Sequence, residues 1–580
     1  LTALSVNTKG ALTGNTKSLV IVGNATVDAD YAGLASLNVT GTTVLKANIT
    51  STGTQVYGGQ VNLLADSVLT GSSVNTKSNL VGNDNSLHIS GAADIDASYT
   101  GLRSITVTGT TDIGANVSTS ANQTYMGAVN LSANAVLTGA NINTRSALTG
   151  NNKSLILAGN ASVDANYDGL STLQASGETQ LGGNVTTSGS QVYEGAVQLI
   201  SSVVLTGSTV QNKGILTGGG KNLTITGNAD IDAGFEGVAN LTITGAVDLD
   251  ANITTSGAQN YQGALRLLRG VNLTGGLINA QNTVEGNANY LSVVGDAKFL
   301  NVVSALGDLS VTGKTEIAAN ISSAGEQTYM GAVNVTANTT LTASRLNTLS
   351  SLTANSKNVS VIGDANIDGD YSGINTLAIS GVADVAANIS TAGTQTYLSA
   401  LNLSGNSTLI GSIIQMRSTV AGGGNRLDII GNLDADASIE GLSSLNVSGS
   451  ADLAANVTST GQQVYQGAVN LSNNLVLAGT DVQTSSTLTG NNYSLVVDAN
   501  AVIIGNYSGL SSLVVSGATQ LGATITTSGD QTLLGDLSLT ANSILVGSVF
   551  NLVNVNLGSY GLSLNGAVDN TLSGVISGAG

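Results

Sequence analysis

Aspartates that recur at a fixed step of 68 residues are the residues of this chain best suited to chemistry. In most copies the aspartate opens a D-x-x-[YF]-x-G phrase. The members are Asp28, Asp96, Asp164, Asp232, Asp368 and Asp436. A row of carboxylates could bind Ca²⁺, but copies three coils apart would lie ~14 Å from one another, too far to share an ion. We therefore expect a role in turns or solubility, with metal binding as the weaker alternative and no cofactor.

A glutamine followed two residues later by a tyrosine recurs at the same step. The pairs are Gln55 with Tyr57, Gln123 with Tyr125, Gln191 with Tyr193, Gln259 with Tyr261, Gln327 with Tyr329, Gln395 with Tyr397 and Gln463 with Tyr465. A stripe of tyrosines could stack on sugar rings. The favoured interpretation is structural: the tyrosine packs against the coil below, and the glutamine bonds a backbone carbonyl at a corner.

An asparagine series and a single histidine complete the candidates. The asparagines, each before a β-branched residue, are Asn48, Asn116, Asn184, Asn252, Asn320, Asn388 and Asn456. We expect an Asx turn or polar stacking at a corner, with N-glycosylation at the N-x-[ST] matches as the alternative. His88 is the only histidine and aligns with variable residues, so no triad or His-based metal site can be built on it. An enzyme needs a unique constellation of residues, and none is visible, so we expect no catalysis.

Composition excludes several further classes. The 580 residues contain no Pro, Cys or Trp, 41% are hydrophobic and only 9% are charged, which is the opposite of a disordered chain. The net charge of −18 disfavours nucleic acid as a partner. The absence of cysteine excludes disulfides and thiolate metal sites. No apolar run is long enough to predict a transmembrane helix.

The regular step of 68 residues predicts a repeat architecture in which each unit contacts mainly its neighbours. Val129 and Leu131 are apolar in every copy, whereas Asn130 between them is polar and variable, which is the alternation of a half-buried strand. Nine or ten short strands per repeat give about three coils of ~23 residues. We predict one continuous all-β domain over residues 1–580: a parallel β-solenoid of about 8.5 repeats and ~25 coils, each advancing about 4.8 Å.

Two irregularities lead to further expectations. The series starts and ends within a repeat, which predicts a longer repeat array, with head-to-tail stacking of chains as the alternative. Residues 285–305 depart from the pattern, because Leu300 stands at the aspartate position and Val303 at the tyrosine position. Sequence drift is the simplest explanation, and a local contact site is the alternative.

Two phrases, TTSGAQNYQGALRL (254–267) and TSANQTYMGAVNLSANAVLTG (119–139), resemble the repeats of filamentous-haemagglutinin-type bacterial adhesins. The segment NTLSGVISGAG (570–580) resembles the β-strand repeat of autotransporter passenger domains. The resemblance implies a right-handed parallel β-helix that is exported to the bacterial cell surface and serves as a stalk in adhesion or in a biofilm matrix.

The expected function is therefore that of a structural, non-catalytic rod in a secreted bacterial surface protein. The alternatives are a self-associating lattice or sheath protein and a carbohydrate-binding β-helix. The expected partners are a host or neighbouring cell surface, a matrix polysaccharide, or further copies of the chain associating end to end or side by side.

Overall fold

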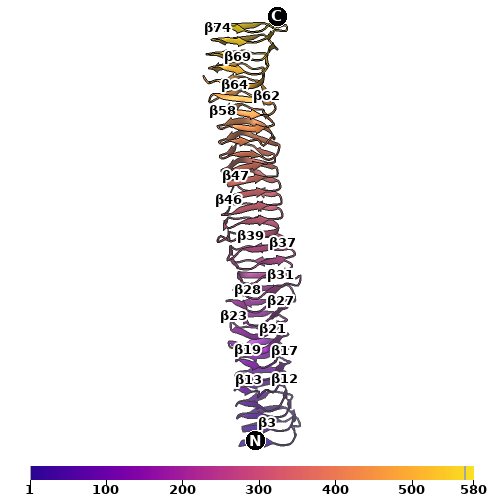
Figure 1. The fold of residues 1–580 in the computed structure, drawn as a ribbon. Coiled ribbons are helices and arrows are strands. Elements are labelled where there is room, and N and C mark those ends of the chain that lie inside the picture. The colour runs from indigo at the N-terminus through magenta and orange to yellow at the C-terminus, as the bar shows by residue number, and fades with distance from the viewer. Residues whose placement is uncertain (1, 567–569, 580) are drawn as a thin grey trace. The chain divides into compact units, whose positions relative to one another are not determined.

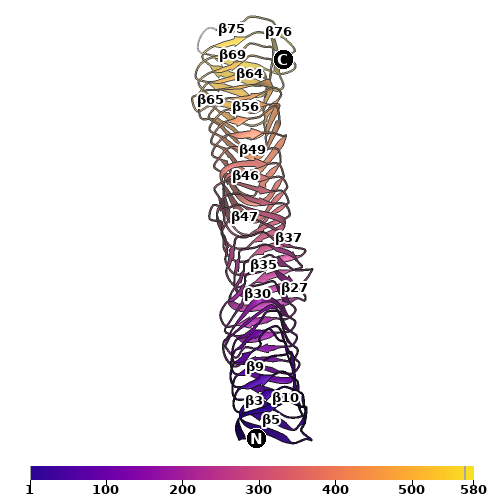
Figure 2. The same ribbon diagram turned by 60° about the horizontal axis from the view of Figure 1, so that its bottom comes forward.

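The protein was analysed as a computed structural model, which describes residues 2–566 and 570–579. The described residues form 76 β-strands and no helix. Contacts divide the chain into a first unit, Leu1–Asn289, and a second unit, Tyr290–Gly580. The first unit contains β1 (Thr2–Thr8) to β38 (Val284–Glu285), and the second contains β39 (Leu291–Phe299) to β76 (Ile576–Ser577). Within each unit the strands stack in parallel turns, so each unit is a parallel β-solenoid (Figures 1 and 2).

One turn of the solenoid contains three strand segments. It runs from β8 (Gln55–Tyr57) through β9 (Val61–Leu63) and the first half of β10 (Ser67–Thr76), whose second half pairs with β8. Tyr57 lies opposite Thr76, nineteen residues later. Other pairs in the ladders are eighteen or twenty residues apart. A turn is therefore shorter than the ~23 residues that the sequence predicted for a triangular coil, and the chain makes more turns than expected.

The short turn results from strands that pass around a corner without a loop. β10 bends at Gly71, and β12 (Leu87–Ile95) bends at Gly91, which has a φ of 140°. Each of these strands pairs on both sides of its bend and so contributes to two faces. The Gly-Ser sequences at these bends are typical of turns between strands, and for this reason the sequence predicted longer coils.

The 68-residue repeat is not a whole number of turns. After Tyr57 the next eleven strand segments are β9, both halves of β10, β11 (Leu80–Val81), both halves of β12, β13 (Tyr99–Leu102), β14 (Ile105–Val107), β15 (Thr111–Ile113), β16 (Val117–Thr119) and β17 (Asn122–Tyr125). Three segments make a turn, so one repeat makes three and two-thirds turns rather than about three. Equivalent residues in successive repeats consequently lie on different faces, and a face recurs only after three repeats.

The core follows the alternation that the sequence predicted. In β18 (Val129–Leu131) the two outer residues are at most 1% exposed, and Asn130 between them is partly exposed. The same buried–exposed–buried pattern recurs in most of the three-residue strands, for example β15 and β16. Each turn therefore contributes apolar side chains to a continuous interior within its unit.

A column of glycines lies at one corner of successive turns. A Cβ on Gly91 would lie 1.8 Å from the carbonyl oxygen of Gly71, and one on Gly109 would lie 2.5 Å from the backbone of Gly91. The same approach, 2.4–2.6 Å, occurs at every member of the recurring series Gly41, Gly109, Gly177, Gly245, Gly313, Gly381, Gly449 and Gly517. These glycines recur because the backbone of the preceding turn fills the space that a side chain would need.

Asparagine side chains connect turns at another corner. The Oδ1 atom of Asn48 accepts a hydrogen bond from the backbone N–H of Val68 in the next turn, at 2.8 Å. The six other members of the asparagine series make the same bond at 2.8–3.0 Å. Each asparagine thus satisfies a backbone donor of the next turn. The role is structural, as expected, but the bond joins two turns and does not close an Asx turn.

Candidate functional site

The recurring glutamine and tyrosine form a buried polar unit inside each repeat. The Nε2 atom of Gln123 donates to the carbonyl oxygens of Val117 and Thr138, at 2.9 and 2.8 Å, and the Tyr125 hydroxyl donates to Gln123 Oε1 at 2.9 Å. Thr138 immediately precedes the bend at Gly139. The glutamine therefore satisfies two carbonyls beside a bend, and the tyrosine satisfies the remaining amide oxygen.

All seven glutamine–tyrosine pairs have this geometry. The seven tyrosines are at most 1% exposed, so none offers a ring face to a sugar. They also do not form a stripe, because the ladder through Tyr57 continues to Thr76 and that through Tyr125 continues to Thr144. Burial raises the pKa of each of these tyrosines well above its ordinary value.

A second buried pair was not predicted from the sequence. The Tyr99 hydroxyl lies 2.7 Å from Thr76 Oγ1, and the same pair occurs at Thr8 with Tyr31, Thr144 with Tyr167, Thr348 with Tyr371 and Thr484 with Tyr507. Where tyrosine is absent, threonine is absent too: the corresponding residues are Asn212 with Phe235, Ala280 with Val303, and Met416 with Ile439. This joint replacement at a spacing of 23 residues is a signal within the chain that could have revealed the contact.

The aspartates of the series are exposed or partly exposed, and all but Asp368 are bound by side chains of neighbouring turns. Asp28 pairs with Lys46 at 2.8 Å, Asp96 with Lys77, Asp164 with Arg145 at 2.5 Å and Asp436 with Arg417 at 2.7 Å. Asp232 accepts from Gln211 at 3.1 Å and Asp368 from Asn366 at 3.2 Å. Burial raises the pKa of Asp164, but the bonds from Ser162 and Arg145 outweigh it and leave that pKa below its usual value.

These aspartates do not form the row that the weaker alternative, calcium binding, would have used. Because a repeat makes three and two-thirds turns, Asp28 and Asp96 lie on different faces, and the next aspartate on the face of Asp28 is Asp232. Eleven turns separate these two carboxylates, or about 53 Å at the spacing of parallel strands. Among the described residues there is no group of three or more His, Cys, Asp or Glu side chains that could hold a metal ion.

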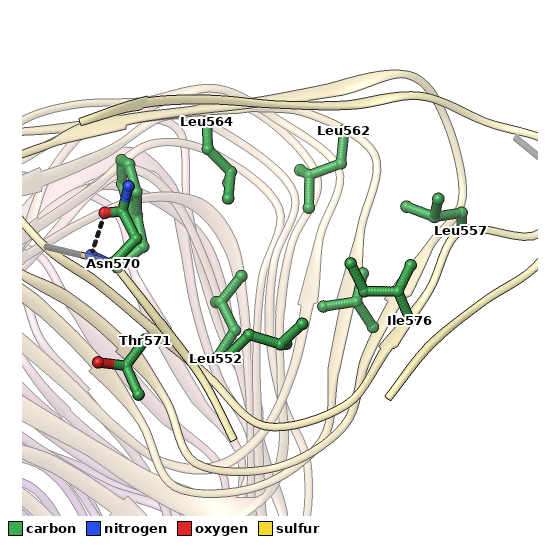
Figure 3. Close-up of a pocket in the computed structure, with 10 residues that line it drawn as sticks. Leu552, Leu557, Leu562, Leu564, Asn570, Thr571 and Ile576 are labelled. Atoms are coloured by element: carbon green, nitrogen blue, oxygen red, sulfur yellow. Dashed lines mark hydrogen bonds between the residues drawn. The ribbon is translucent and has the colours of Figure 1, made fainter. Parts of the chain in front are cut away.

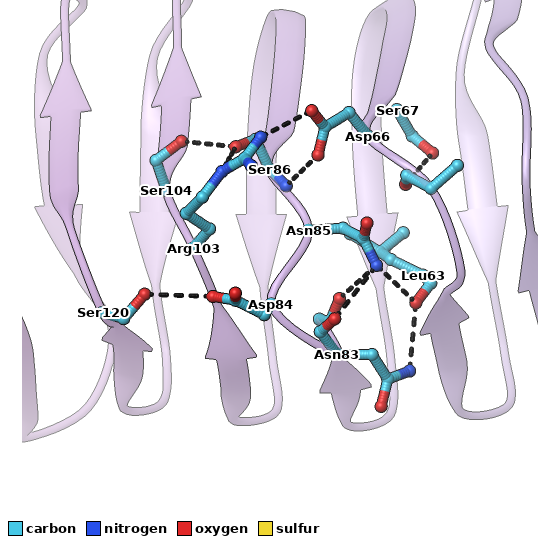
Figure 4. A network of polar contacts seen from close by, with 12 residues as sticks. Leu63, Asp66, Ser67, Asn83, Asp84, Asn85, Ser86, Arg103, Ser104 and Ser120 are labelled. Carbon is cyan, nitrogen blue, oxygen red and sulfur yellow. Dashed lines mark hydrogen bonds and ion pairs between the residues drawn. The ribbon is translucent and has the colours of Figure 1, made fainter.

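The polar network in Figure 4 connects consecutive turns of the first unit, from Leu63 to Ser120. Asp66 Oδ1 accepts from the backbone N–H of Ser86 at 2.8 Å, and Arg103 Nη2 bonds Asp66 Oδ2 at 2.6 Å. Arg103 Nε also donates to Ser86 Oγ at 3.0 Å. The bond from Ser86 and the nearby guanidinium lower the pKa of the Asp66 carboxyl. Most of these bonds join one turn to another, and the remainder, such as Ser67 Oγ to the carbonyl oxygen of Ala65, lie within a turn, so the network stabilises the stacking of the turns.

An apolar pocket of about 190 Å³ lies among the last strands of the second unit (Figure 3). It is lined mainly by aliphatic side chains of β72 (Phe550–Leu552), β74 (Leu562–Gly566) and β76. Its polar residues are Thr571 and Asn570, and Asn570 Oδ1 accepts from the backbone N–H of Phe550 at 3.1 Å. The lining combines buried side chains such as Phe550 with exposed ones such as Leu564 and Ile576, and it contains no acid, base or nucleophile poised for chemistry.

The divergent segment 285–305 combines several irregular features. Tyr290, Leu300 and Val302 are 39–46% exposed, whereas Val303 is buried. Ala305 has a φ of 55°, a left-handed conformation that glycine adopts in the other copies described. This conformation costs an alanine roughly 1 kcal/mol. The segment is thus locally strained, and the boundary between the two units falls within it.

Comparison with family models, curated proteins and solved structures gave no significant match. The described residues contain no helix with the length and hydropathy that a membrane span needs.

Proposed function

We propose that the chain is a non-catalytic structural segment of a secreted bacterial surface protein, acting as an adhesin stalk or as a filament of the extracellular matrix. One observation carries this proposal: the residues that recur most strictly connect one turn to the next. The glutamine–tyrosine pairs are buried, the glycines stack backbone on backbone, and the asparagines bond the following turn.

The stepping of the repeat around the solenoid supports the same proposal. A repeated ligand-binding motif would be expected to present its copies on one face, where a long ligand could meet several of them. Here each copy of the repeat is rotated by two-thirds of a turn about the solenoid axis relative to the preceding copy. Repetition therefore adds length to a solenoid without building a row of equivalent surface sites. The resemblance to filamentous-haemagglutinin-type repeats supports export and a surface location.

A deletion that preserves the repeat tests this function. Removing residues 398–465 joins Tyr397 to Gln466 and restores equivalent neighbours on both sides. We expect a folded protein that is shorter by three and two-thirds turns, about 18 Å, and that still supports attachment when returned to its native surface protein. A matched deletion of residues 398–431 breaks the register and is expected to misfold. Loss of attachment by the folded 398–465 deletion would contradict the proposal, because it would place a specific site there.

The alternative is a lattice or sheath protein whose copies associate with one another. Electron microscopy of the purified chain distinguishes the two. Separate particles of constant length support the stalk or filament, and ordered sheets or side-by-side fibres support the lattice. The net charge of −18 favours separate particles at low salt, because like-charged surfaces repel.

A further inference from the structure

Residues 141–180 of the first unit line a polar groove that the structural role does not explain. Its walls are β19 (Ala135–Thr144), β21 (Ser154–Val163) and β24 (Thr179–Leu181), which pair in parallel in consecutive turns. The outward residues Asn143, Ser162 and Gln180 are opposite one another across these strands, so they form a row along the solenoid axis. The groove encloses about 280 Å³.

The strands that form the groove bend immediately before it. β19 bends at Gly139 and β21 at Gly159, where a Cβ on Gly159 would lie 1.8 Å from the carbonyl oxygen of Gly139. The backbone of one turn fills the space that a side chain of the next would need there. The two strands are therefore in close contact at the bend that precedes the groove.

Hydrogen bonds within the chain hold one wall of the groove in place. Asn141 Nδ2 donates to Asn122 Oδ1 at 2.9 Å, and Asn160 Oδ1 accepts from the backbone N–H of Glu178 at 3.0 Å. Asn160 Nδ2 lies 3.4 Å from Asn141 Oδ1. A wall that is already ordered loses little conformational freedom when a ligand binds.

Two groups in the groove remain unpaired. Among the described residues, the Asn143 amide and the Glu178 carboxylate make no side-chain hydrogen bond or ion pair, whereas Arg145 is paired with Asp164. The amide can donate and accept, and the carboxylate can accept. This combination matches hydroxyl groups, which also donate and accept. The free carboxylate disfavours polyanions.

The equivalent positions in neighbouring repeats lack this set. Asn141, Asn160 and Glu178 correspond to Ser73, Ala92 and Thr110 in the preceding repeat and to Thr209, Asn228 and Ala246 in the following one. We propose that this groove binds an uncharged, hydroxyl-rich saccharide chain running along the solenoid axis, held by Asn143 and Glu178.

Titration of the purified chain with neutral hexasaccharides of β-linked glucose and of β-linked N-acetylglucosamine tests the proposal, with polygalacturonate as the acidic control. We expect one of the neutral probes to bind with an affinity that salt does not change. The double variant Asn143→Ala and Glu178→Ala should weaken binding at least about tenfold, since two hydrogen bonds are lost. The control variant Asn470→Ala and Glu236→Ala, which removes outward side chains elsewhere, should bind as the parent does.

A second measurement does not depend on how the variants fold. Carbodiimide-mediated labelling of carboxylates should be slowed at Glu178 by the bound hexasaccharide and should be unchanged at Glu236. Absence of binding by both neutral probes, binding of polygalacturonate alone, or equal labelling of Glu178 with and without the saccharide would each overturn the assignment.

Discussion

Tyr99 and Phe235 stand at the same position of two repeat copies in the first unit, but their side chains make different contacts. In the first copy the Tyr99 hydroxyl bonds Thr76 Oγ1, and Thr76 Oγ1 also lies 3.4 Å from the carbonyl oxygen of Asp94. In the second copy Phe235 has no hydroxyl, and Asn212 replaces the threonine. Asn212 Nδ2 donates to the carbonyl oxygen of Gly214 at 2.5 Å, but its Oδ1 atom is buried without a partner. The comparison shows that the core is built from coupled pairs.

A second comparison, in the second unit, leads to the same conclusion. Gln463 has its tyrosine partner, whereas Gln531 is followed by Leu533 and its buried Oε1 has no hydrogen-bond partner. In the parallel ladder Gln531 pairs with Phe550, whereas Gln463 pairs with Val482 at the equivalent position. Leu533 is smaller than the tyrosine of the other copies, and Phe550 is larger than Val482. The volume of the core is thus conserved although the hydrogen bond is lost.

Among the tests of this comparison, alkaline pH should change the free energy of unfolding most. Burial raises the pKa of Tyr507 to about 12 and those of Tyr57, Tyr99 and Tyr125 above that value. Below pH ~10, tyrosines are protonated in both the folded and unfolded states and contribute no pH dependence. Above it, only the unfolded state loses protons, so each buried tyrosine removes about 1.4 kcal/mol of stability by pH ~11.

With several buried tyrosines in each unit, we expect cooperative alkaline unfolding near pH 11 to 12. Phenolate absorbance and circular dichroism should change together. Gradual phenolate formation with intact circular dichroism would contradict the assignment of these tyrosines to the core.

Replacing one buried glutamine should have the next largest effect. Gln123→Leu leaves the carbonyls of Val117 and Thr138 and the Tyr125 hydroxyl buried without their partner, and each such group costs about 1–3 kcal/mol. We expect the free energy of unfolding to fall by about 4 kcal/mol, as measured by urea denaturation. The control Gln198→Leu, on an outward face, should change it by less than about 0.5 kcal/mol. Similar losses in both variants would show that the glutamine bonds are not decisive.

Much of the fold followed from the sequence because alternation is a local property. The burial of Val129 and Leu131 beside the outward Asn130 could be predicted from three adjacent residues. The number of residues per turn could not be predicted in this way. Whether the chain leaves the sheet at Gly71 or bends through it depends on backbone contact with the neighbouring turn, which sequence pattern does not encode.

The error in the turn length also affected the candidate sites. A tyrosine stripe or a row of aspartates requires a repeat with a whole number of turns, and two-thirds of a turn is enough to separate the copies. The contact between Thr76 and Tyr99, in contrast, could have been found by aligning the repeats and noting that both residues change together. Long-range pairing in a repeat protein is therefore readable from its own copies when two positions exchange as a pair.

A double-mutant cycle should sharpen the comparison between the copies of Tyr99 and Phe235. Tyr99→Phe and Thr76→Val should each cost about 1 kcal/mol, and the double variant should cost clearly less than their sum, with a coupling of about 1 kcal/mol. The reciprocal change, Asn212→Thr with Phe235→Tyr, removes the unpaired Oδ1 and restores the bond. It should raise the free energy of unfolding by about 1–2 kcal/mol. Additive effects in the cycle would show that the two hydroxyls do not act as a pair.

The smallest expected effect concerns hydroxyls that are buried without any partner. Thr43, Thr111, Thr315 and Thr519 occupy one repeat position, are at most 1% exposed, and have an unsatisfied Oγ1 atom. Val247 fills the same position in another copy and is fully buried, so the site accepts a methyl group in place of the hydroxyl. Thr111→Val should therefore raise the free energy of unfolding by about 1 kcal/mol, because it removes an unpaired polar atom at nearly constant volume.

The matched control for this change is Thr179, at the same position, whose Oγ1 lies 3.4 Å from the carbonyl oxygen of Gly177. Thr179→Val gives up a weak hydrogen bond as it removes the hydroxyl, so we expect a gain smaller than that of Thr111→Val. Urea denaturation of both variants measures the difference. Destabilisation by Thr111→Val would mean that its hydroxyl is paired in solution. The difference between copies with and without a hydrogen-bond partner would then apply to the buried glutamines and tyrosines, and not to the threonines.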